Sequence, residues 1–251
     1  MEPAVEMQSN ILRHLDEKFG PLITANCEEH GDYETRREWM ICPVCQHETD
    51  ELEADKEREA RRQAILAARW GECGMPDKFC GITLDEWIER TSDHVAVKDS
   101  ARRFIAGEVT RMLLIGNCGT GKTMLAAGVI GEMALKKDCK PVYSTATRLI
   151  RSIRDSWKTK EQTEQAVMDK FIDADVLVVD ELGAGRCSED DRLILSEILC
   201  DRYSADMPTL LISNMTGDQI KESVLDDRAV DRLREGGEVI VMKWQSERRK
   251  G

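Results

Sequence analysis

Beyond residue 81, short apolar runs alternate with longer stretches in which apolar residues recur every three to four positions. Short, almost wholly apolar runs are typical of strands buried on both faces, and the longer stretches are typical of helices. The predicted strands are Arg111–Ile115, Pro141–Ser144, Val176–Asp180, Thr209–Ser213 and Val239–Met242, and the clearest predicted helices are Thr123–Lys137 and Asp191–Tyr203. This alternation predicts an α/β fold with a doubly wound, five-stranded parallel sheet.

The N-terminal part of the chain has a different pattern. Residues 4–19 have the apolar spacing of a helix that ends at Gly20-Pro21. From residue 50 to residue 71 the chain is dense in Glu, Lys, Arg and Ala, which predicts a solvated helix supported by opposite charges three and four residues apart. We therefore expect a small N-terminal module over residues 1–49, a charged helical linker over 50–71 and the α/β domain over 72–251.

Composition and charge narrow the class of protein. The chain has 251 residues, of which 41% are hydrophobic, as in ordinary globular proteins. No apolar run approaches the roughly 20 residues of a membrane span, and the first residues lack the basic and apolar regions of a secretory signal, so we expect a cytoplasmic protein. The net charge of −12 argues against a protein that coats duplex DNA, although a local basic strip can still guide a nucleic-acid strand.

A phosphate-binding motif follows the first of the predicted strands. The segment GNCGTGKT fits the pattern G-x-x-x-x-G-K-[ST] between a predicted strand and a predicted helix. Its glycines let backbone N–H groups approach phosphate oxygens, Lys122 is suited to reach the β- and γ-phosphates, and the Thr123 hydroxyl is suited to bind Mg²⁺. The expected ATP-binding residues are Gly116, Asn117, Cys118, Gly119, Thr120, Gly121, Lys122 and Thr123.

Two adjacent carboxylates end a later predicted strand. Asp180 and Glu181 follow the apolar run that starts at Val176, and a parallel sheet places its ligand at the carboxyl ends of its strands. Asp180 is the expected second magnesium ligand, and Glu181 is the expected general base that polarises the attacking water. Alone the pair would indicate only a surface loop, but downstream of a phosphate-binding motif it indicates hydrolysis of ATP.

Residues 72–251 resemble the DnaC/DnaI-type loaders of the replicative helicase, which are AAA+ ATPases, and their phage-encoded relatives. The resemblance rests on GNCGTGKT, VLVVDELG, MPTLLISN and above all DDRAVDRLREGGEVIVMKWQSER. It implies that Asn214 is the sensor 1 residue beside the γ-phosphate, Arg232 the arginine finger offered to a neighbouring subunit, and Arg248 the sensor 2 arginine. Arg228 matches a further arginine whose role is open. A planar, permanently charged guanidinium suits such phosphate contacts.

A cysteine and histidine cluster precedes residue 46. The pairs Cys27-x2-His30 and Cys42-x2-Cys45 have the spacing of a tetrahedral Zn²⁺ site, with each pair on a turn. The stretch has too few apolar residues to fold alone, so metal binding would supply its folding free energy. His47 is an alternative ligand, and unliganded surface thiols are the alternative interpretation. Some loaders carry a comparable zinc module that contacts the helicase, and this region is similar to it by spacing only.

A basic helix is expected after the second strand of the α/β domain. Positive side chains recur there every three to four residues around an aromatic ring, as required for binding the phosphates and bases of single-stranded DNA. The expected contacts are Arg151, Arg154, Trp157 and Lys158, with Arg148 on the same helix. A solvated helix with Trp157 packed inward is the alternative. The corresponding region of the loaders lines the path of single-stranded DNA.

Together these features predict an oligomeric, ATP-dependent loader of a hexameric replicative helicase onto single-stranded DNA during replication initiation. We expect a weak, Mg²⁺-dependent ATPase activity that DNA stimulates. The expected partners are the helicase, single-stranded DNA and further copies of this chain, without a membrane. One alternative is the ATPase helper of an insertion-sequence transposase, which shares the same core. The other is a metal-binding adaptor with a relict ATP site, against which the intact Lys122, Asp180, Glu181 and Asn214 count.

Overall fold

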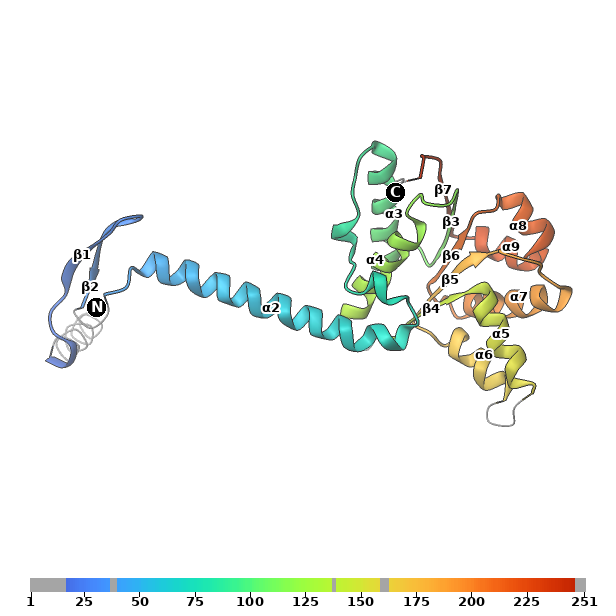
Figure 1. Ribbon diagram of the computed structural model, residues 1–251, viewed down its shortest axis with the longest axis horizontal. Helices are drawn as coiled ribbons and strands as arrows, with labels where there is room; N and C mark the ends of the chain where they lie inside the picture. The colour runs from blue at the N-terminus through green and yellow to red at the C-terminus, as the bar shows by residue number, and fades with distance from the viewer. Residues whose placement is uncertain (1–16, 37–39, 137–138, 159–162, 247–251) are drawn as a thin grey trace, which may run out of the picture. The chain divides into compact units, whose positions relative to one another are not determined.

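The computed structural model describes residues 17–36, 40–136, 139–158 and 163–246. It divides into two compact units, residues 1–61 and 62–251 (Figure 1). The boundary falls inside the stretch that the sequence assigns to a linker over 50–71. The helix expected over residues 4–19 lies almost entirely outside the described residues.

The first unit contains a hairpin and the beginning of a long helix. Strands β1 (Ile23–Cys27) and β2 (Gly31–Thr35) pair antiparallel, with Cys27 opposite Gly31 at the turn. Gly31 has φ 78°, which is accessible to glycine without strain and lets the chain reverse within three residues. The sequence pattern did not predict this hairpin, because its strands carry few apolar residues.

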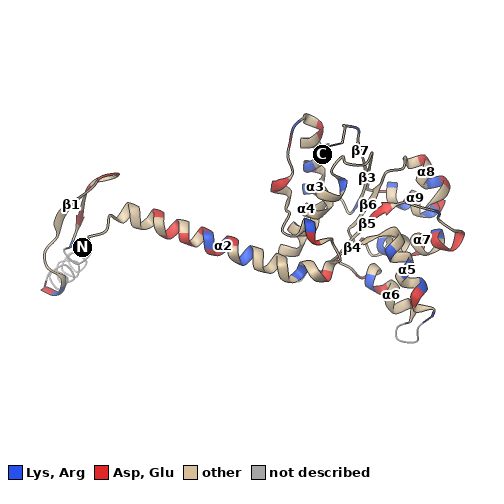
Figure 2. Ribbon diagram, in the orientation of Figure 1, with Lys and Arg blue, Asp and Glu red and all other residues tan. Residues whose placement is uncertain are grey.

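Helix α2 (Pro43–Cys73) begins well before the predicted charged segment and includes all of it. Pro43 occupies the first turn, where its missing N–H leaves no intrahelical bond unmade. Acidic and basic side chains lie along the helix, as Figure 2 shows. Its buried residues, Leu66, Trp70 and Cys73, are confined to the C-terminal part, where Trp70 and Cys73 join the core of the second unit.

The second unit is built on the five-stranded sheet that the sequence predicts. Its strands run in the order β4-β5-β6-β3-β7, and all four neighbouring pairs are parallel. The strands are β3 (Arg111–Gly116), β4 (Pro141–Thr145), β5 (Val176–Leu182), β6 (Thr209–Ser213) and β7 (Gly237–Met242). The expected fold class is therefore confirmed, with strand ends within two residues of the predicted ones.

Helices cover both faces of this sheet, as the alternation of buried residues along β3 illustrates. Met112 and Leu114 pack with α3 and α4 on one face, and Leu113 and Ile115 pack with α5, α6, α7 and α9 on the other. The helices of this unit are α3 (Ser92–Ala106), α4 (Lys122–Leu135), α5 (Ala146–Ser156), α6 (Glu164–Ile172), α7 (Glu189–Ser204), α8 (Gly217–Ser223) and α9 (Asp227–Arg234), with short 3₁₀ turns at Asp77–Phe79 and Leu84–Glu86.

A buried arginine ties the amino ends of the strands together. Arg202 of α7 is 0% exposed and donates hydrogen bonds to backbone carbonyls at the end of α6 and before β5 and β6. Burial lowers the pKa of Arg202 to about 10, so the side chain remains charged at neutral pH. The cation is held by carbonyl dipoles, which is a structural role at the end of the sheet opposite the phosphate-binding motif.

Candidate functional site

The phosphate-binding motif forms a loop between β3 and α4. Gly119 and Gly121 have φ 84° and 92°, a conformation that side chains rarely adopt. A Cβ atom on Gly121 would also lie 2.8 Å from the ring of Trp87. Lys122 is the first residue of α4, and its ammonium donates to the carbonyl oxygens of Gly116 and Asn117 at 2.6 and 2.8 Å. The loop therefore has the backbone shape that cradles phosphates, with its lysine held beside it.

Asp180 and Thr123 meet at the carboxyl ends of the strands. The Thr123 hydroxyl donates to Oδ2 of Asp180 at 2.8 Å, and the backbone N–H of Glu181 donates to Oδ1 at 2.6 Å. Asp180 is 4% exposed. A buried carboxylate beside a hydroxyl offers the hard oxygen ligands that Mg²⁺ prefers, so these residues fit a magnesium site. When bound, Mg²⁺ neutralises charge on phosphate oxygens.

Glu181 lies at an irregularity in β5. The pairing of β5 with β6 skips from Val179 to Leu182 while β6 advances from Leu211 to Ser213, so β5 holds one extra residue. Glu181 has φ 56°, a costly left-handed conformation for this residue type, and it is exposed. A bulge of this kind re-aims a side chain out of the strand pattern, which frees Glu181 to act at the strand end.

Asn214 follows β6, which lies between β3 and β5 in the sheet. Its amide nitrogen is 3.4 Å from the sulfur of Cys118 in the phosphate-binding loop. The strand order thus places Asn214 between the loop and the Asp180–Glu181 pair. This is the position expected for a side chain that orients water near a γ-phosphate.

An aromatic cluster packs against the loop, and no sequence motif predicted it. The indole N–H of Trp244 donates to the carbonyl oxygen of Thr120 at 3.1 Å, and its ring packs on His94 with centroids 4.2 Å apart. Trp87 contacts both rings. Because the C=O of Thr120 and the N–H of Gly121 belong to one trans peptide, they point in opposite directions. The contact with Trp244 therefore directs the Gly121 N–H away from the indole ring.

Arg232, on α9, lies at the end of the sheet opposite the phosphate-binding loop. Its guanidinium stacks over the ring of Tyr203 at 4.6 Å, and Arg111, the first residue of β3, stacks over the same ring at 4.9 Å. The phosphate-binding loop begins at Gly116, at the far end of β3 and roughly 16 Å away along the strand. Arg228 of the same helix is exposed. The predicted sensor 2 residue, Arg248, lies outside the described residues.

The basic helix expected after β4 is α5, and its charged residues differ in their surroundings. Arg154 pairs with Asp191 at 2.8 Å and donates to Ser188, so it helps to hold the start of α7. Contrary to expectation, α5 ends at Ser156, so Trp157 and Lys158 lie just after the helix, and Lys158 pairs with Asp155 at 3.0 Å. Trp157 is 53% exposed, so its ring is not packed inward. A cavity of about 270 Å³ is lined by the basic residues Arg151, Arg154, Lys158 and Arg186.

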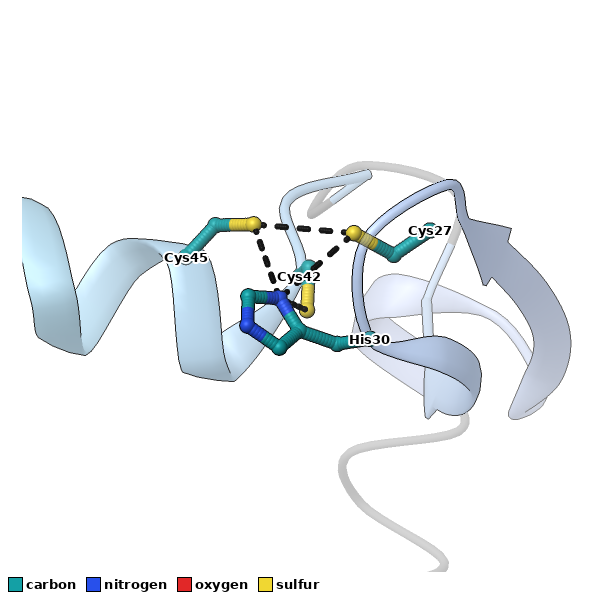
Figure 3. A group of neighbouring side chains, drawn as sticks. All are labelled: Cys27, His30, Cys42 and Cys45. Carbon is teal, nitrogen blue, oxygen red and sulfur yellow. Dashed lines mark hydrogen bonds between the residues drawn. The ribbon is translucent and has the colours of Figure 1, made fainter.

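The four predicted metal ligands converge in the first unit (Figure 3). Cys27 and His30 flank the hairpin turn, and Cys42 and Cys45 lie at the start of α2. His30 Nδ1 is 3.8, 3.9 and 3.3 Å from the sulfurs of Cys27, Cys42 and Cys45, and the sulfurs of Cys27 and Cys45 are 3.5 Å apart. These residues could hold a metal ion. Contrary to the expectation of two turns, one pair uses a helix start.

The surroundings of the cluster shift the pKa values of two of its thiols and orient its histidine. Hydrogen bonds from the backbone N–H groups of Glu29 and His30 lower the pKa of Cys27 to about 6, which favours the thiolate. The contact with Cys27 raises the pKa of Cys45 to about 12, as expected for neighbouring sulfurs that share a proton. The other ring nitrogen of His30 lies 3.4 Å from Glu48, an arrangement that orients metal-binding histidines. His47 instead pairs with Glu51, away from the group.

A parallel sheet with the phosphate-binding loop after β3 and a carboxylate pair at β5 is the arrangement of a P-loop nucleotide-binding fold. A family described as IstB-like ATP binding protein matches residues 50–251. This match covers most of the chain, and the protein belongs to the family of IstB-like ATP binding proteins.

Similar curated proteins include helicase loaders. The chain is 26% identical over 152 residues to the replicative helicase loader DnaC of Escherichia coli K12, which covers 59% of this chain and 61% of that protein. It is 24% identical over 201 residues to the replicative helicase loader DnaC of Buchnera aphidicola subsp. Baizongia pistaciae, with coverage of 78% and 79%. The chain thus spans 61% of the length of the Escherichia coli relative.

Solved structures have a similar fold over about two thirds of the chain. The crystal structure of the DnaC helicase loader has a TM-score of 0.59 at 20% identity and covers 66% of this chain and 99% of that one. The crystal structure of DnaI has a TM-score of 0.58 at 25% identity, with coverage of 67% and 94%. These similarities confirm the AAA+ fold. None of the described helices has the length and apolar character needed to cross a membrane.

Proposed function

We propose that this protein is an ATP-dependent loader of a hexameric replicative DNA helicase onto single-stranded DNA. The observation that carries the proposal is that Lys122, Thr123 and Asp180 lie at one end of the sheet in a chain similar to proteins named replicative helicase loaders. Loading requires a nucleotide switch, a surface for the helicase and a path for DNA. Candidates for each of these three elements are present among the described residues.

Hydrolysis of ATP follows from the arrangement at the carboxyl ends of the strands. The loop N–H groups and Lys122 bind the phosphates, and Thr123 with Asp180 would hold Mg²⁺. Glu181, carried out of the strand by the bulge, takes the proton of the attacking water, and Asn214 orients that water. Each residue contributes by position and charge, since phosphoryl transfer depends mainly on these two effects.

The activity belongs to an assembly of several copies. Arg232 lies near the amino end of β3, too far from the nucleotide site of its own chain to touch its phosphates. An arginine in this position fits a finger offered to the nucleotide of a neighbouring copy. The cation–π contacts with Tyr203 hold its guanidinium in place.

Mixing experiments test the role of Arg232. Arg232→Ala is expected to bind ATP normally and to lose ATPase activity stimulated by single-stranded DNA. Mixing it with Lys122→Ala, which keeps its finger, is expected to restore part of the activity, because a wild-type finger then faces a wild-type loop. Activity of the mixture no higher than that of the two separate variants would contradict the role in trans.

The N-terminal module is the proposed helicase-binding end, and Zn²⁺ is its proposed metal. Three thiolates and one imidazole are a preferred ligand set of structural zinc sites. Exposed apolar side chains beside the cluster, at Met40, Ile41 and Val44, give this module surface for a protein partner. Single-stranded DNA is proposed to bind at α5, where Arg151 and the exposed Trp157 offer a phosphate contact and a stacking surface.

A loading assay tests the proposal. The replicative helicase of the source cell is incubated with circular single-stranded DNA, this protein and ATP, and the helicase bound to the circles is measured. We expect the wild-type protein to increase this amount and Lys122→Ala to leave it near background. The transposase helper is the second candidate, because the family is described by its IstB-like members. If the protein captures a transposase and does not increase the amount of loaded helicase, the loader function is wrong and the transposase helper is the better assignment.

A further inference from the structure

Tyr143 contacts the proposed magnesium-binding carboxylate from a neighbouring strand. It belongs to β4 and lies opposite Val178, two residues before the pair of Thr145 with Asp180. Its side chain is 5% exposed and packs in the hydrophobic core. The hydroxyl nevertheless donates a hydrogen bond to Oδ2 of Asp180 at 2.9 Å. A phenol in an apolar core needs such a partner, and the partner here is a residue of the nucleotide site.

The carboxylate of Asp180 is held at both oxygens. Oδ1 accepts from the backbone N–H of Glu181, and Oδ2 accepts from the hydroxyls of both Thr123 and Tyr143. The donor from Glu181 fixes only one oxygen, and Thr123 is itself a proposed magnesium ligand. Tyr143 is the described side chain that holds Oδ2 without being a ligand or a reacting group.

The protonation of Tyr143 suits this task. A tyrosine hydroxyl ordinarily has a pKa of about 10, well above neutral pH. The phenol therefore stays protonated throughout the neutral range and is a permanent donor. A hydrogen bond to a charged acceptor is roughly twice as strong as one between neutral groups.

We propose that Tyr143 is a positioning residue that sets the orientation of the Asp180 carboxylate for Mg²⁺ and so controls how strongly the metal strengthens nucleotide binding. This inference rests on the proposed ATP-binding function. Tyr143 lies on β4, an edge strand of the sheet, and belongs neither to the phosphate-binding motif nor to the Asp180–Glu181 pair. The proposal therefore gives this edge strand a role in binding Mg²⁺.

The test is the substitution Tyr143→Phe in the full-length protein, which removes the hydroxyl and keeps the ring. The dissociation constant of a fluorescent ATP analogue is measured with EDTA and over a series of Mg²⁺ concentrations. We expect an unchanged constant in EDTA and a Mg²⁺ concentration for half-maximal tightening that rises by about tenfold, the effect of losing one hydrogen bond to a charged group. Ser144→Ala is the matched control, since it removes a buried hydroxyl on the same strand that contacts Thr145 instead of Asp180.

The possible results distinguish a failure of the Tyr143 positioning role from a failure of the proposed ATP-binding function. Equal Mg²⁺ curves for Tyr143→Phe and the wild type would overturn the positioning role while leaving ATP binding intact. A parallel loss of affinity in EDTA and in Mg²⁺, with a lower melting temperature, would also overturn it, because it would show a packing role. A wild-type protein that does not bind the analogue at all would overturn the ATP-binding function and the inference with it.

Discussion

The two units of the chain differ in what holds them together. Up to residue 61, the side chains that are buried among the described residues are Thr35, Arg36 and Cys42. In the second unit, apolar side chains fill both faces of the five-stranded sheet, and several strand residues are completely buried. Hydrophobic stabilisation scales with the apolar area removed from water, so it can support the second unit but not the first.

A different kind of interaction is therefore expected to stabilise each unit. In the first, a hairpin turn and a helix start bring together four residues that could hold a metal ion, so we expect its stability to depend on that ion. The second relies on packing and a small number of buried polar contacts. This difference allows the N-terminal module to be unfolded selectively while the nucleotide site keeps its shape.

The largest expected effect is on the metal cluster. Because a structural zinc site contributes on the order of 10 kcal/mol to its own module, Cys42→Ser with Cys45→Ser is expected to unfold the first unit and leave the second unit unchanged. Elemental analysis should find about one zinc per wild-type chain and none in the double variant. Hydrogen exchange should show lost protection confined to residues before about 61. Wild-type protein with far less than one zinc per chain after metal-replete expression would contradict the account.

A substitution in the second unit provides the opposite test. Arg202→Met leaves the carbonyls of Phe171, Ile172, Ala174 and Pro208 without their buried donor. We expect the free energy of unfolding to fall by about 3 kcal/mol or more, as for other losses of buried hydrogen-bonded charge. Urea denaturation measures the change. The control Arg192→Met, on the same helix with one carbonyl contact, should cost about 1 kcal/mol, and equal effects would contradict the role of Arg202.

A substitution of the proposed general base should lower the rate of ATP hydrolysis without lowering the free energy of unfolding. Glu181→Gln removes the proposed base and keeps the size of the side chain, so ATP affinity should stay at the wild-type value. The rate of hydrolysis should fall by at least about tenfold, the low end for loss of a general base. Steady-state phosphate release and binding of a fluorescent analogue give the two quantities. Unaltered turnover in the purified variant would remove Glu181 from the mechanism.

The smallest expected effect concerns the aromatic cluster behind the loop. Trp244→Phe keeps a ring against His94 and loses the N–H that binds the carbonyl of Thr120. ATP affinity should weaken by about fivefold, since one neutral hydrogen bond contributes about 1 kcal/mol. Trp70→Phe is the control, because its indole contacts Pro76 and not the loop. Isothermal titration that gives the same affinity for both variants would argue against an orienting role for Trp244.

Much of the second unit could be predicted from the sequence. Strands buried on both faces of a parallel sheet are short and apolar, so runs such as Val176–Val179 stood out from their helical surroundings. The phosphate-binding motif is contiguous, and its residues therefore remain in one loop in the structure. The metal cluster could be anticipated from spacing, although the helix start that carries Cys42 and Cys45 could not.

Other features depend on contacts between residues far apart in the sequence. The hydrogen bond of Tyr143 to Asp180 forms because β4 and β5 are neighbours in the sheet. The hydrogen bond of Trp244 to Thr120 forms because the segment after β7 packs against the phosphate-binding loop. The bulge at Glu181 depends on the pairing of β5 with β6, because residues of any type can form such an irregularity. For the same reason Arg154, expected at a DNA surface, was not foreseen as a partner of Asp191.

The division of tasks between the two units is tested most directly by capture of the helicase. Wild-type protein and the Cys42→Ser, Cys45→Ser double variant are immobilised and exposed to purified replicative helicase of the source cell, and ATP affinity is measured on the same preparations. We expect the wild type to retain the helicase and the double variant to lose it while binding ATP with unchanged affinity. Capture of the helicase by the double variant at wild-type strength, or loss of ATP affinity together with capture, would contradict this expectation.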